Sequence, residues 1–216
     1  MRLTAVELAC HRGGRDVFSG VSFTVGAGEA LTITGRNGAG KSTLLRLAVG
    51  FLRPSGGSLR LDGGDPELSI GEQAHYLGHQ DAVKPSLSVG ENLQFWTTFL
   101  GAASIKVPDA LEVMGLGGIS ALPAAYLSAG QRRRLSIARL IAVKRPIWLL
   151  DEPTSTLDAA AQHRLADVMR SHLAEGGLVL AATHASLELA GAKELRLGES
   201  DREPTPAALT PGEGRP

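Results

Sequence analysis

The chain has 216 residues, of which 43% are hydrophobic and 4% aromatic, and this length suits one large domain with an aliphatic core. Lysine plus arginine equals aspartate plus glutamate at 22 each, so the balanced charge argues against a general nucleic-acid binder. The single cysteine excludes an internal disulfide.

Short apolar strands alternate with helices along the chain. The pattern predicts strands over 2–10, twice within 20–35, and over 57–63, 74–80, 146–152 and 178–184. It predicts helices over 41–51, 88–100, 109–118, from about 131, and over 158–177. No run approaches ~18 apolar residues and no signal peptide is evident, so we expect no membrane span. The fold expected is α/β, with a mainly parallel sheet, antiparallel N-terminal strands and a small helical insert.

The domain plan follows from the same pattern. We expect one domain over 1–198, with the helical insert at about 84–143. Proline, glycine and charged residues dominate 199–216, and we expect this tail to be disordered.

The segment "GRNGAGKST" matches the phosphate-loop pattern G-x-x-x-x-G-K-[ST] between a predicted strand and a predicted helix. Its glycines let the backbone wrap phosphates, Lys41 suits the β- and γ-phosphates, Ser42 suits Mg²⁺, and Thr43 suits the α-phosphate. A plain glycine-rich turn is the alternative, which the strand–loop–helix context disfavours. We expect the whole loop to bind nucleotide: Gly35, Arg36, Asn37, Gly38, Ala39, Gly40, Lys41, Ser42 and Thr43.

Two later strands end in residues suited to ATP hydrolysis. Asp151 and Glu152 follow an apolar strand, where Asp151 can hold Mg²⁺ and Glu152 can take a proton from water as a general base. His184 ends the next strand and can contact a γ-phosphate. The alternatives are a charged pair that caps a loop and an ordinary loop histidine.

The segment "LSAGQRRRLSIARL" resembles a second anion-binding helix N-terminus, although one nucleotide does not need two. Asp158 suits the N-cap of the helix that follows "TSTLD". We expect the arginines 132–134 to form a solvated or interface-lining helical face.

These segments together resemble the ATP-binding subunits of ABC transporters. The matching positions are Gly35–Thr43, Gln80, Leu127–Gln131, Leu149–Glu152, Ser155–Asp158 and His184. The resemblance implies that ATP and Mg²⁺ bind between two copies packed head to tail. It also implies that Ser128, Gly130 and Gln131 of one copy meet the γ-phosphate held by the other. Gln80 would touch Mg²⁺ or the attacking water, and multispanning membrane subunits would be the partners.

A closer resemblance rests on "LGHQDAVKPSLSVGENLQFW" and on "LSAGQRRRLxxARL" in a short chain. These segments are similar to those of the haem-exporter ATP-binding subunits of cytochrome c maturation. That resemblance implies a peripheral place on the cytoplasmic face of the bacterial inner membrane. ATP hydrolysis would be coupled there to haem export or haem-chaperone release. A different exported substrate, a soluble ABC ATPase without a transport role and a regulatory module with little turnover are the alternatives.

The sequence leaves two assignments open: the residue that stacks on adenine, and the role of Trp96. Family members stack adenine on an aromatic residue whose place falls at about Arg12, or at His11 if the count shifts by one. The segment 81–99 is our candidate for the surface that contacts the membrane subunits. We expect Phe95 and Phe99 to pack the helical insert, whereas Trp96 suits either role.

Overall fold

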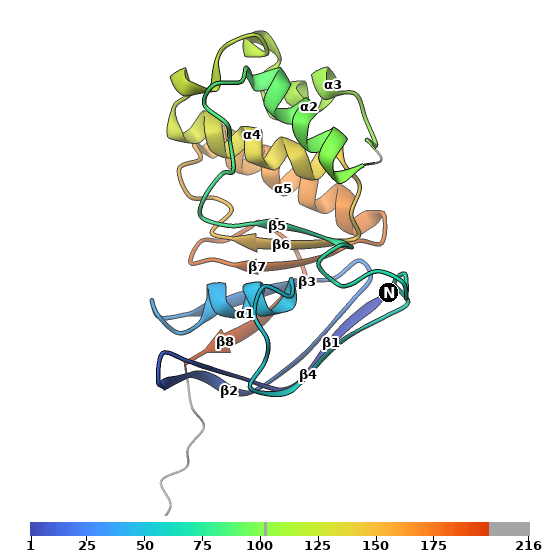
Figure 1. The fold of residues 1–216 in the computed structure, drawn as a ribbon, viewed down its shortest axis with the longest axis vertical. Helices are drawn as coiled ribbons and strands as arrows, with labels where there is room; N and C mark the ends of the chain where they lie inside the picture. Colours follow the sequence, from blue (N-terminus) through green and yellow to red (C-terminus); the bar gives the residue numbers. More distant parts are fainter. Residues whose placement is uncertain (102, 199–216) are drawn as a thin grey trace, which may run out of the picture.

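Two sheets of different kinds form the framework of the molecule (Figure 1). The computed structural model describes residues 1–101 and 103–198, so the tail predicted over 199–216 lies outside the described residues. A three-stranded antiparallel sheet has the order β2-β1-β4, with β1 Arg2–Arg12, β2 Arg15–Gly26 and β4 Gly56–Asp62. The five-stranded parallel sheet consists of β5 Ala74–Leu77, β6 Ile147–Asp151, β7 Leu178–Ala182, β3 Ala30–Gly35 and β8 Lys193–Leu197, in that order.

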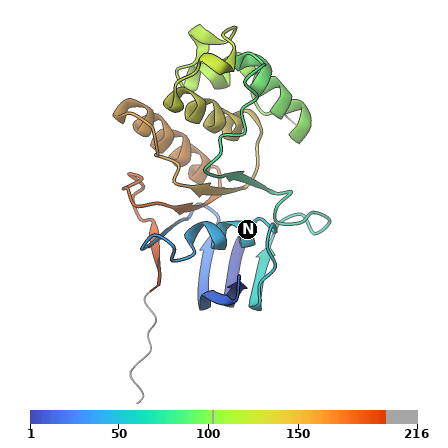
Figure 2. The same ribbon diagram turned by 60° about the vertical axis from the view of Figure 1, so that its left-hand side comes forward.

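Helices cover both faces of the parallel sheet (Figures 1 and 2). Helix α1 lies between the two sheets, and α2, α3, α4 and α5 lie beyond the other face. Their bounds are α1 Lys41–Ala48, α2 Val89–Leu100, α3 Val107–Val113, α4 Ala129–Ala142 and α5 Ala159–Ala174, with 3₁₀ turns η1 Gly117–Ile119 and η2 Ala124–Tyr126. Across the part of the chain that the structure describes, no helix is long and apolar enough to cross a bilayer. The parallel sheet, the antiparallel N-terminal strands and the helices on both faces confirm the predicted α/β fold.

The central strands separate two hydrophobic cores. All five residues of β6 and of β7 are buried, as expected for parallel strands covered on both faces. Leu149 packs in the core shared with α1 and the antiparallel sheet, whereas Leu150 packs in the core shared with α2–α5. Because successive strand residues point to opposite faces, β6 joins both layers and fixes the place where it ends.

One strand was absent from the sequence-based prediction. Strand β8 pairs in parallel with β3 at the sheet edge, from Leu31 opposite Lys193 to Gly35 opposite Leu197. Its burial is low apart from Leu197, because only one side has a neighbouring strand and little covers it. The edge strand nevertheless supports the end of β3, from which the phosphate loop begins.

Candidate functional site

The phosphate loop, Gly35–Thr43, connects the end of β3 to the start of α1. Gly35 has φ 134°, and a Cβ there would lie 2.3 Å from the carbonyl oxygen of Leu197. Gly40 is the N-cap of α1 with φ 99°, and it has no side-chain cap. The loop therefore needs glycine at both ends, and the first N–H groups of α1 have no capping side chain to bond with.

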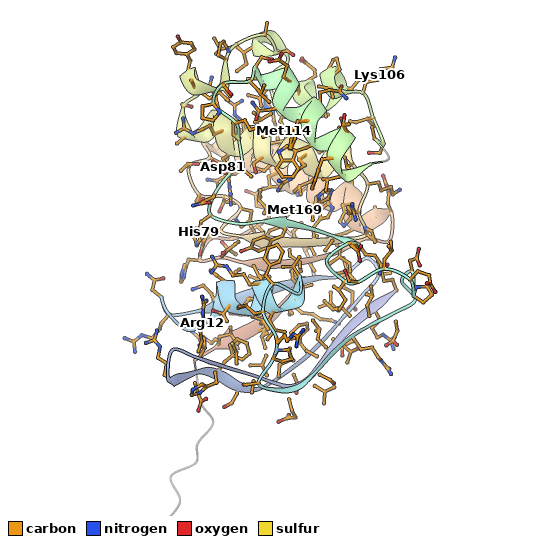
Figure 3. The ribbon with its side chains drawn as sticks, in the orientation of Figure 1. Arg12, His79, Asp81, Lys106, Met114 and Met169 are labelled. Carbon is orange, nitrogen blue, oxygen red and sulfur yellow. The ribbon has the colours of Figure 1, made fainter. Side chains whose placement is uncertain are left out.

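This loop borders a hollow of about 830 Å³, a size that suits a nucleotide. The hollow lies at the carboxyl ends of β3 and β6, where parallel sheets bind ligands. In Figure 3, Arg12 and His79 lie on the same side of the molecule. The lining residues are Arg12, Gly13, Arg15, Val17, Asn37, Gly38, Gly40, Lys41, Ser42, Thr43, His79, Asp151 and Glu152.

Lys41 and His184 meet beside this hollow. Lys41 is buried at 8% exposure, and its Nζ donates to the carbonyl of Gly35 at 2.8 Å. The Nε2 atom of His184 lies 2.9 Å from Lys41 Nζ and 3.8 Å from Glu152 Oε1. Three residues predicted from separate segments are thus brought together by the ends of β6 and β7 and the start of α1.

Ser42 and Asp151 form the second contact across the hollow. Ser42 Oγ donates to Asp151 Oδ1 at 3.0 Å, and Asp151 is 1% exposed. The other oxygen, Asp151 Oδ2, is buried without a hydrogen bond, and His79 Nε2 lies 3.6 Å from it. A buried carboxylate oxygen that lacks a donor, next to a serine hydroxyl, fits the oxygen ligands of Mg²⁺.

Glu152 faces the hollow for a different reason from the one predicted. The strand predicted over 146–152 would include Glu152, but β6 ends at Asp151. Glu152 instead begins a turn with φ 47°, and its N–H donates to the carbonyl of Ala182 at 2.8 Å. A left-handed backbone in a residue that is not glycine is rare and needs support from its surroundings.

The signature turn, Leu127–Gln131, lies elsewhere on the chain. Ser128 is the N-cap of α4: its Oγ accepts from Gln131 N, and Gln131 Oε1 accepts from Ser128 N at 2.8 Å. A Cβ on Gly130 would lie 2.8 Å from the carbonyl oxygen of Thr156. Among the described residues, the lining of the 830 Å³ hollow includes Lys41 but not Ser128, Gly130 or Gln131. One chain therefore does not bring both phosphate-binding turns to one hollow.

Arg12 and Gln80 occupy different positions relative to the hollow. Arg12 lines it at the end of β1, whereas His11 Nδ1 lies 2.9 Å from Asp16 Oδ1. Gln80 lines a second hollow of about 900 Å³, whereas the neighbouring His79 has its Nε2 atom 3.6 Å from Asp151 Oδ2. The structure thus brings Arg12 to the nucleotide hollow and leaves Gln80 beside it.

The second hollow includes Gln80, Trp96 and Arg139 in its wall. The Arg139 guanidinium lies 4.5 Å from the Trp96 ring centroid, and Trp96 Nε1 donates to the Ala82 carbonyl at 3.3 Å. Phe99 is 69% exposed, so the prediction that it packs the helical insert is wrong for this residue. Phe99 stacks on Phe95 at the surface instead, with ring centroids 5.9 Å apart.

The prediction of a solvated or interface-lining arginine face is wrong for Arg133, whose exposure within the single chain is 2%. Its guanidinium donates to the main chain of the turn after β6 and of the segment after β5. The helical period carried the signal, because Arg133 lies four and seven residues before the buried Ile137 and Leu140. This signal was overlooked because three consecutive arginines suggest an exposed face.

Comparisons with known proteins agree with this geometry. The family model described as ABC transporter matches residues 18–155. The chain is 60% identical over 198 residues to the cytochrome c biogenesis ATP-binding export protein CcmA of Nitrobacter winogradskyi, covering 92% of this chain and 98% of that protein. It is 61% identical over 202 residues to the protein of the same name from Nitrobacter hamburgensis, again covering 92% and 98%.

The fold has solved counterparts as well. A bacterial Atm1-family ABC exporter with ATP bound superposes with a TM-score of 0.77 at 26% identity, covering 91% of this chain and 37% of that one. Agreement of fold and of sequence along nearly the whole chain leaves one assignment. The chain belongs to the ABC transporter family, and within it to the group of cytochrome c biogenesis ATP-binding export proteins CcmA.

Proposed function

We propose that this chain is the ATP-hydrolysing subunit of an ABC export system, and that residues 1–198 form its ATP-binding domain. The observation that carries the proposal is the meeting of two contacts at one hollow: Ser42 with Asp151, and Lys41 with His184. Glu152 lies beside both, within 3.8 Å of His184. Phosphate binding, metal binding and proton transfer need this set of groups.

ATP binds with its phosphates wrapped by the phosphate loop. The Lys41 ammonium exchanges its bond to the Gly35 carbonyl for the β- and γ-phosphate oxygens. Ser42 and Asp151 would hold Mg²⁺, which would supply positive charge to the phosphates, and Gln80 would approach the same ion from its loop. Loop N–H groups from Gly35 to Thr43 hold the remaining phosphate oxygens.

Hydrolysis requires a base at the γ-phosphate. Glu152 accepts the proton of the attacking water because its carboxylate faces the hollow while its main chain is held in the turn after β6. His184 donates to the γ-phosphate from its place between Lys41 and Glu152. Arg12 lies flat on the adenine ring.

The site is completed by a second copy of the chain. The capping box of α4 satisfies the N–H groups of Ser128 and Gln131, while those of Ala129 and Gly130 have no acceptor within the helix. These two N–H groups and the positive end of α4 suit a γ-phosphate that another copy holds. In a head-to-tail pair, each Ser128–Gln131 turn closes the hollow of its partner.

The relatives that match along nearly the whole chain are named cytochrome c biogenesis ATP-binding export proteins. We place this chain in the same process, with haem export or haem-chaperone release as the coupled step and a different exported substrate as the alternative. Multispanning membrane subunits contact the segment 81–99, where the second hollow, Trp96 and the exposed Phe99 lie. The chain then binds peripherally at the cytoplasmic face of the inner membrane and has no nucleic-acid partner.

The test is Glu152→Gln, which keeps the shape of the side chain and removes the base. We expect kcat for ATP to fall roughly 10³-fold while ATP still binds, measured by phosphate release and by calorimetry. Glu175→Gln on the exposed surface, where Glu175 pairs with Lys144, is the matched control and should hydrolyse at the wild-type rate. Wild-type turnover by Glu152→Gln would remove Glu152 from its role.

A further inference from the structure

A single buried guanidinium, that of Arg133, joins three segments of the site. Arg133 lies in the second turn of α4, two residues after the signature turn ends, and is 2% exposed. A charged group buried so completely needs close partners, since burial without them is costly. Among the described residues, its hydrogen-bond partners belong to the segment 151–153 at the end of β6 or to the segment 78–81 after β5.

The first set of partners is the turn that carries Glu152. Arg133 Nη2 donates to the carbonyls of Asp151 and Glu152, both at 2.8 Å, and Nε donates to the carbonyl of Pro153 at 3.3 Å. Three successive carbonyls therefore face α4. With these carbonyls held by α4, the Glu152 side chain is presented to the nucleotide hollow.

The second set of partners is the loop that carries Gln80. Arg133 Nη1 donates to the Gly78 carbonyl at 2.7 Å and pairs with Asp81 Oδ1 at 3.2 Å. Figure 3 shows Asp81 and His79 on the side of the molecule where Arg12 lies. One planar guanidinium thus joins the Gly78 carbonyl and the Asp81 side chain, on either side of Gln80, to the main chain of Glu152.

We propose that Arg133 is a positioning residue for Glu152, which holds the base in its left-handed turn and ties that turn to the Gln80 loop. The proposal rests on the role of Glu152 given above. Glu152 keeps φ 47° while its carbonyl accepts from Arg133. Without the guanidinium, three carbonyls lose a donor and the turn can relax, which moves the carboxylate off the water.

The test compares Arg133→Met and Arg133→Lys with Arg134→Met in the full chain, co-purified with its co-expressed membrane subunits. Arg134 is a matched control, because among the described residues its Nη1 donates to the carbonyls of Met114 and Gly115, neither of which lines the nucleotide hollow. We expect Arg133→Met to lower kcat roughly 10²-fold with KM for ATP unchanged, since the phosphate loop is intact. Arg133→Lys should lose less, because an ammonium replaces some of the donors.

A double-mutant cycle separates positioning from a general loss of structure. In the Glu152→Gln background, Arg133→Met should lower the residual turnover by no more than about twofold, because the base is already absent. An equal fall in both backgrounds would overturn the proposal, and so would unchanged kcat in Arg133→Met. If Arg133→Met does not fold, the same cycle is run with Arg133→Lys.

A crystal structure of the Arg133→Lys variant gives a readout that does not depend on turnover. The proposal expects Glu152 to leave its left-handed conformation or its carboxylate to shift. A Glu152 that stays in place in this structure overturns the proposal. Failure of the wild type and of Arg134→Met to hydrolyse ATP would count against the proposed function alone, and the structure would still decide the role of Arg133.

Discussion

Two helices of this molecule begin at a turn of small residues, and they begin in different ways. Helix α1 starts after Gly40 with no side-chain cap, so its first N–H groups await a ligand. Helix α4 starts after Ser128 with a complete capping box from Gln131. The first N–H groups of α1 therefore need a ligand such as phosphate as their hydrogen-bond acceptor. The side chains of Ser128 and Gln131 supply the acceptors at the start of α4.

This difference divides the work between the two turns. The turn at α1 lies with Lys41 and Asp151 at one hollow and can bind ATP within a single chain. The turn at α4 is closed by its capping box and does not line that hollow, so in our proposal it acts on a nucleotide held by a second copy. Binding should therefore depend on α1, and turnover on both.

Among changes that separate the two turns, Ser128→Arg has the largest expected effect. The substitution removes the N-cap oxygen and puts a long side chain where the partner's phosphate must lie. We expect turnover to fall at least ~10²-fold, because a positioned donor set for the γ-phosphate is lost. ATP binding by the single chain should stay within about twofold, as expected for a distant site. Phosphate release and calorimetry measure the two quantities.

Ser88→Arg is the control that measures how much the loss of a helix cap by itself lowers the unfolding free energy. Ser88 caps α2 through the same kind of box with Glu91. Both substitutions should cost about 1 kcal/mol of unfolding free energy. Unchanged turnover in Ser128→Arg, despite that cost, would mean that the two turns do not share a nucleotide.

The next effect is a dependence of stability on pH, which two buried histidines cause. One of them, His75, attaches α4 to the sheet. His75 Nε2 donates to the carbonyl of Val143 at the C-terminal end of α4, and burial lowers the pKa of His75 to about 3. His172 stacks on Trp148 with centroids 3.9 Å apart, and burial lowers its pKa to about 4. Both pKa values lie below about 6.5, the value in the unfolded chain. The unfolded chain therefore binds protons that the folded chain does not.

Stability is accordingly present above about pH 6.5 and is lost as the pH falls toward 4. At pH 5 each histidine should lower the unfolding free energy by about 2 kcal/mol relative to pH 7.5. Urea unfolding at several pH values measures this change. His75→Gln keeps a donor for Val143 and should remove about half of the pH dependence that the two histidines cause. An unaltered pH dependence in His75→Gln would show that its burial does not control the attachment of α4.

The local sequence pattern was sufficient to predict the phosphate loop, but it did not predict the segments that surround this loop in the fold. The phosphate loop and the apolar runs of β6 and β7 were readable because each is a continuous segment whose chemistry is set by neighbours in sequence. The fold followed from those runs. The places of Ser42 and Asp151 side by side also followed, since parallel strands deliver their carboxyl ends to one edge.

Other features depend on contacts between distant segments. The helical period alone marked Arg133 as buried, and nothing in the arginine run showed its partners, because these come from two other parts of the chain. The left-handed turn at Glu152 depends on carbonyls held by α4, and β8 has too few apolar residues to mark an edge strand. The placement of His79, rather than Gln80, beside Asp151 reflects where β5 ends, at Leu77.

The smallest expected effect lies at the rim of the open hollow. Arg12→Ala removes a guanidinium that lines this hollow, and loss of a cation–π contact worth about 1 kcal/mol should weaken ATP binding about fivefold. Binding of inorganic tripolyphosphate should not change, because the contact that we propose is to the base and not to the phosphates. His11→Ala is the matched control: His11 pairs with Asp16 outside the hollow, so this substitution should leave both affinities unchanged. A larger loss of ATP affinity in His11→Ala than in Arg12→Ala would show that His11, and not Arg12, contacts adenine. Equal losses of affinity for ATP and tripolyphosphate in Arg12→Ala would show that Arg12 binds the phosphates.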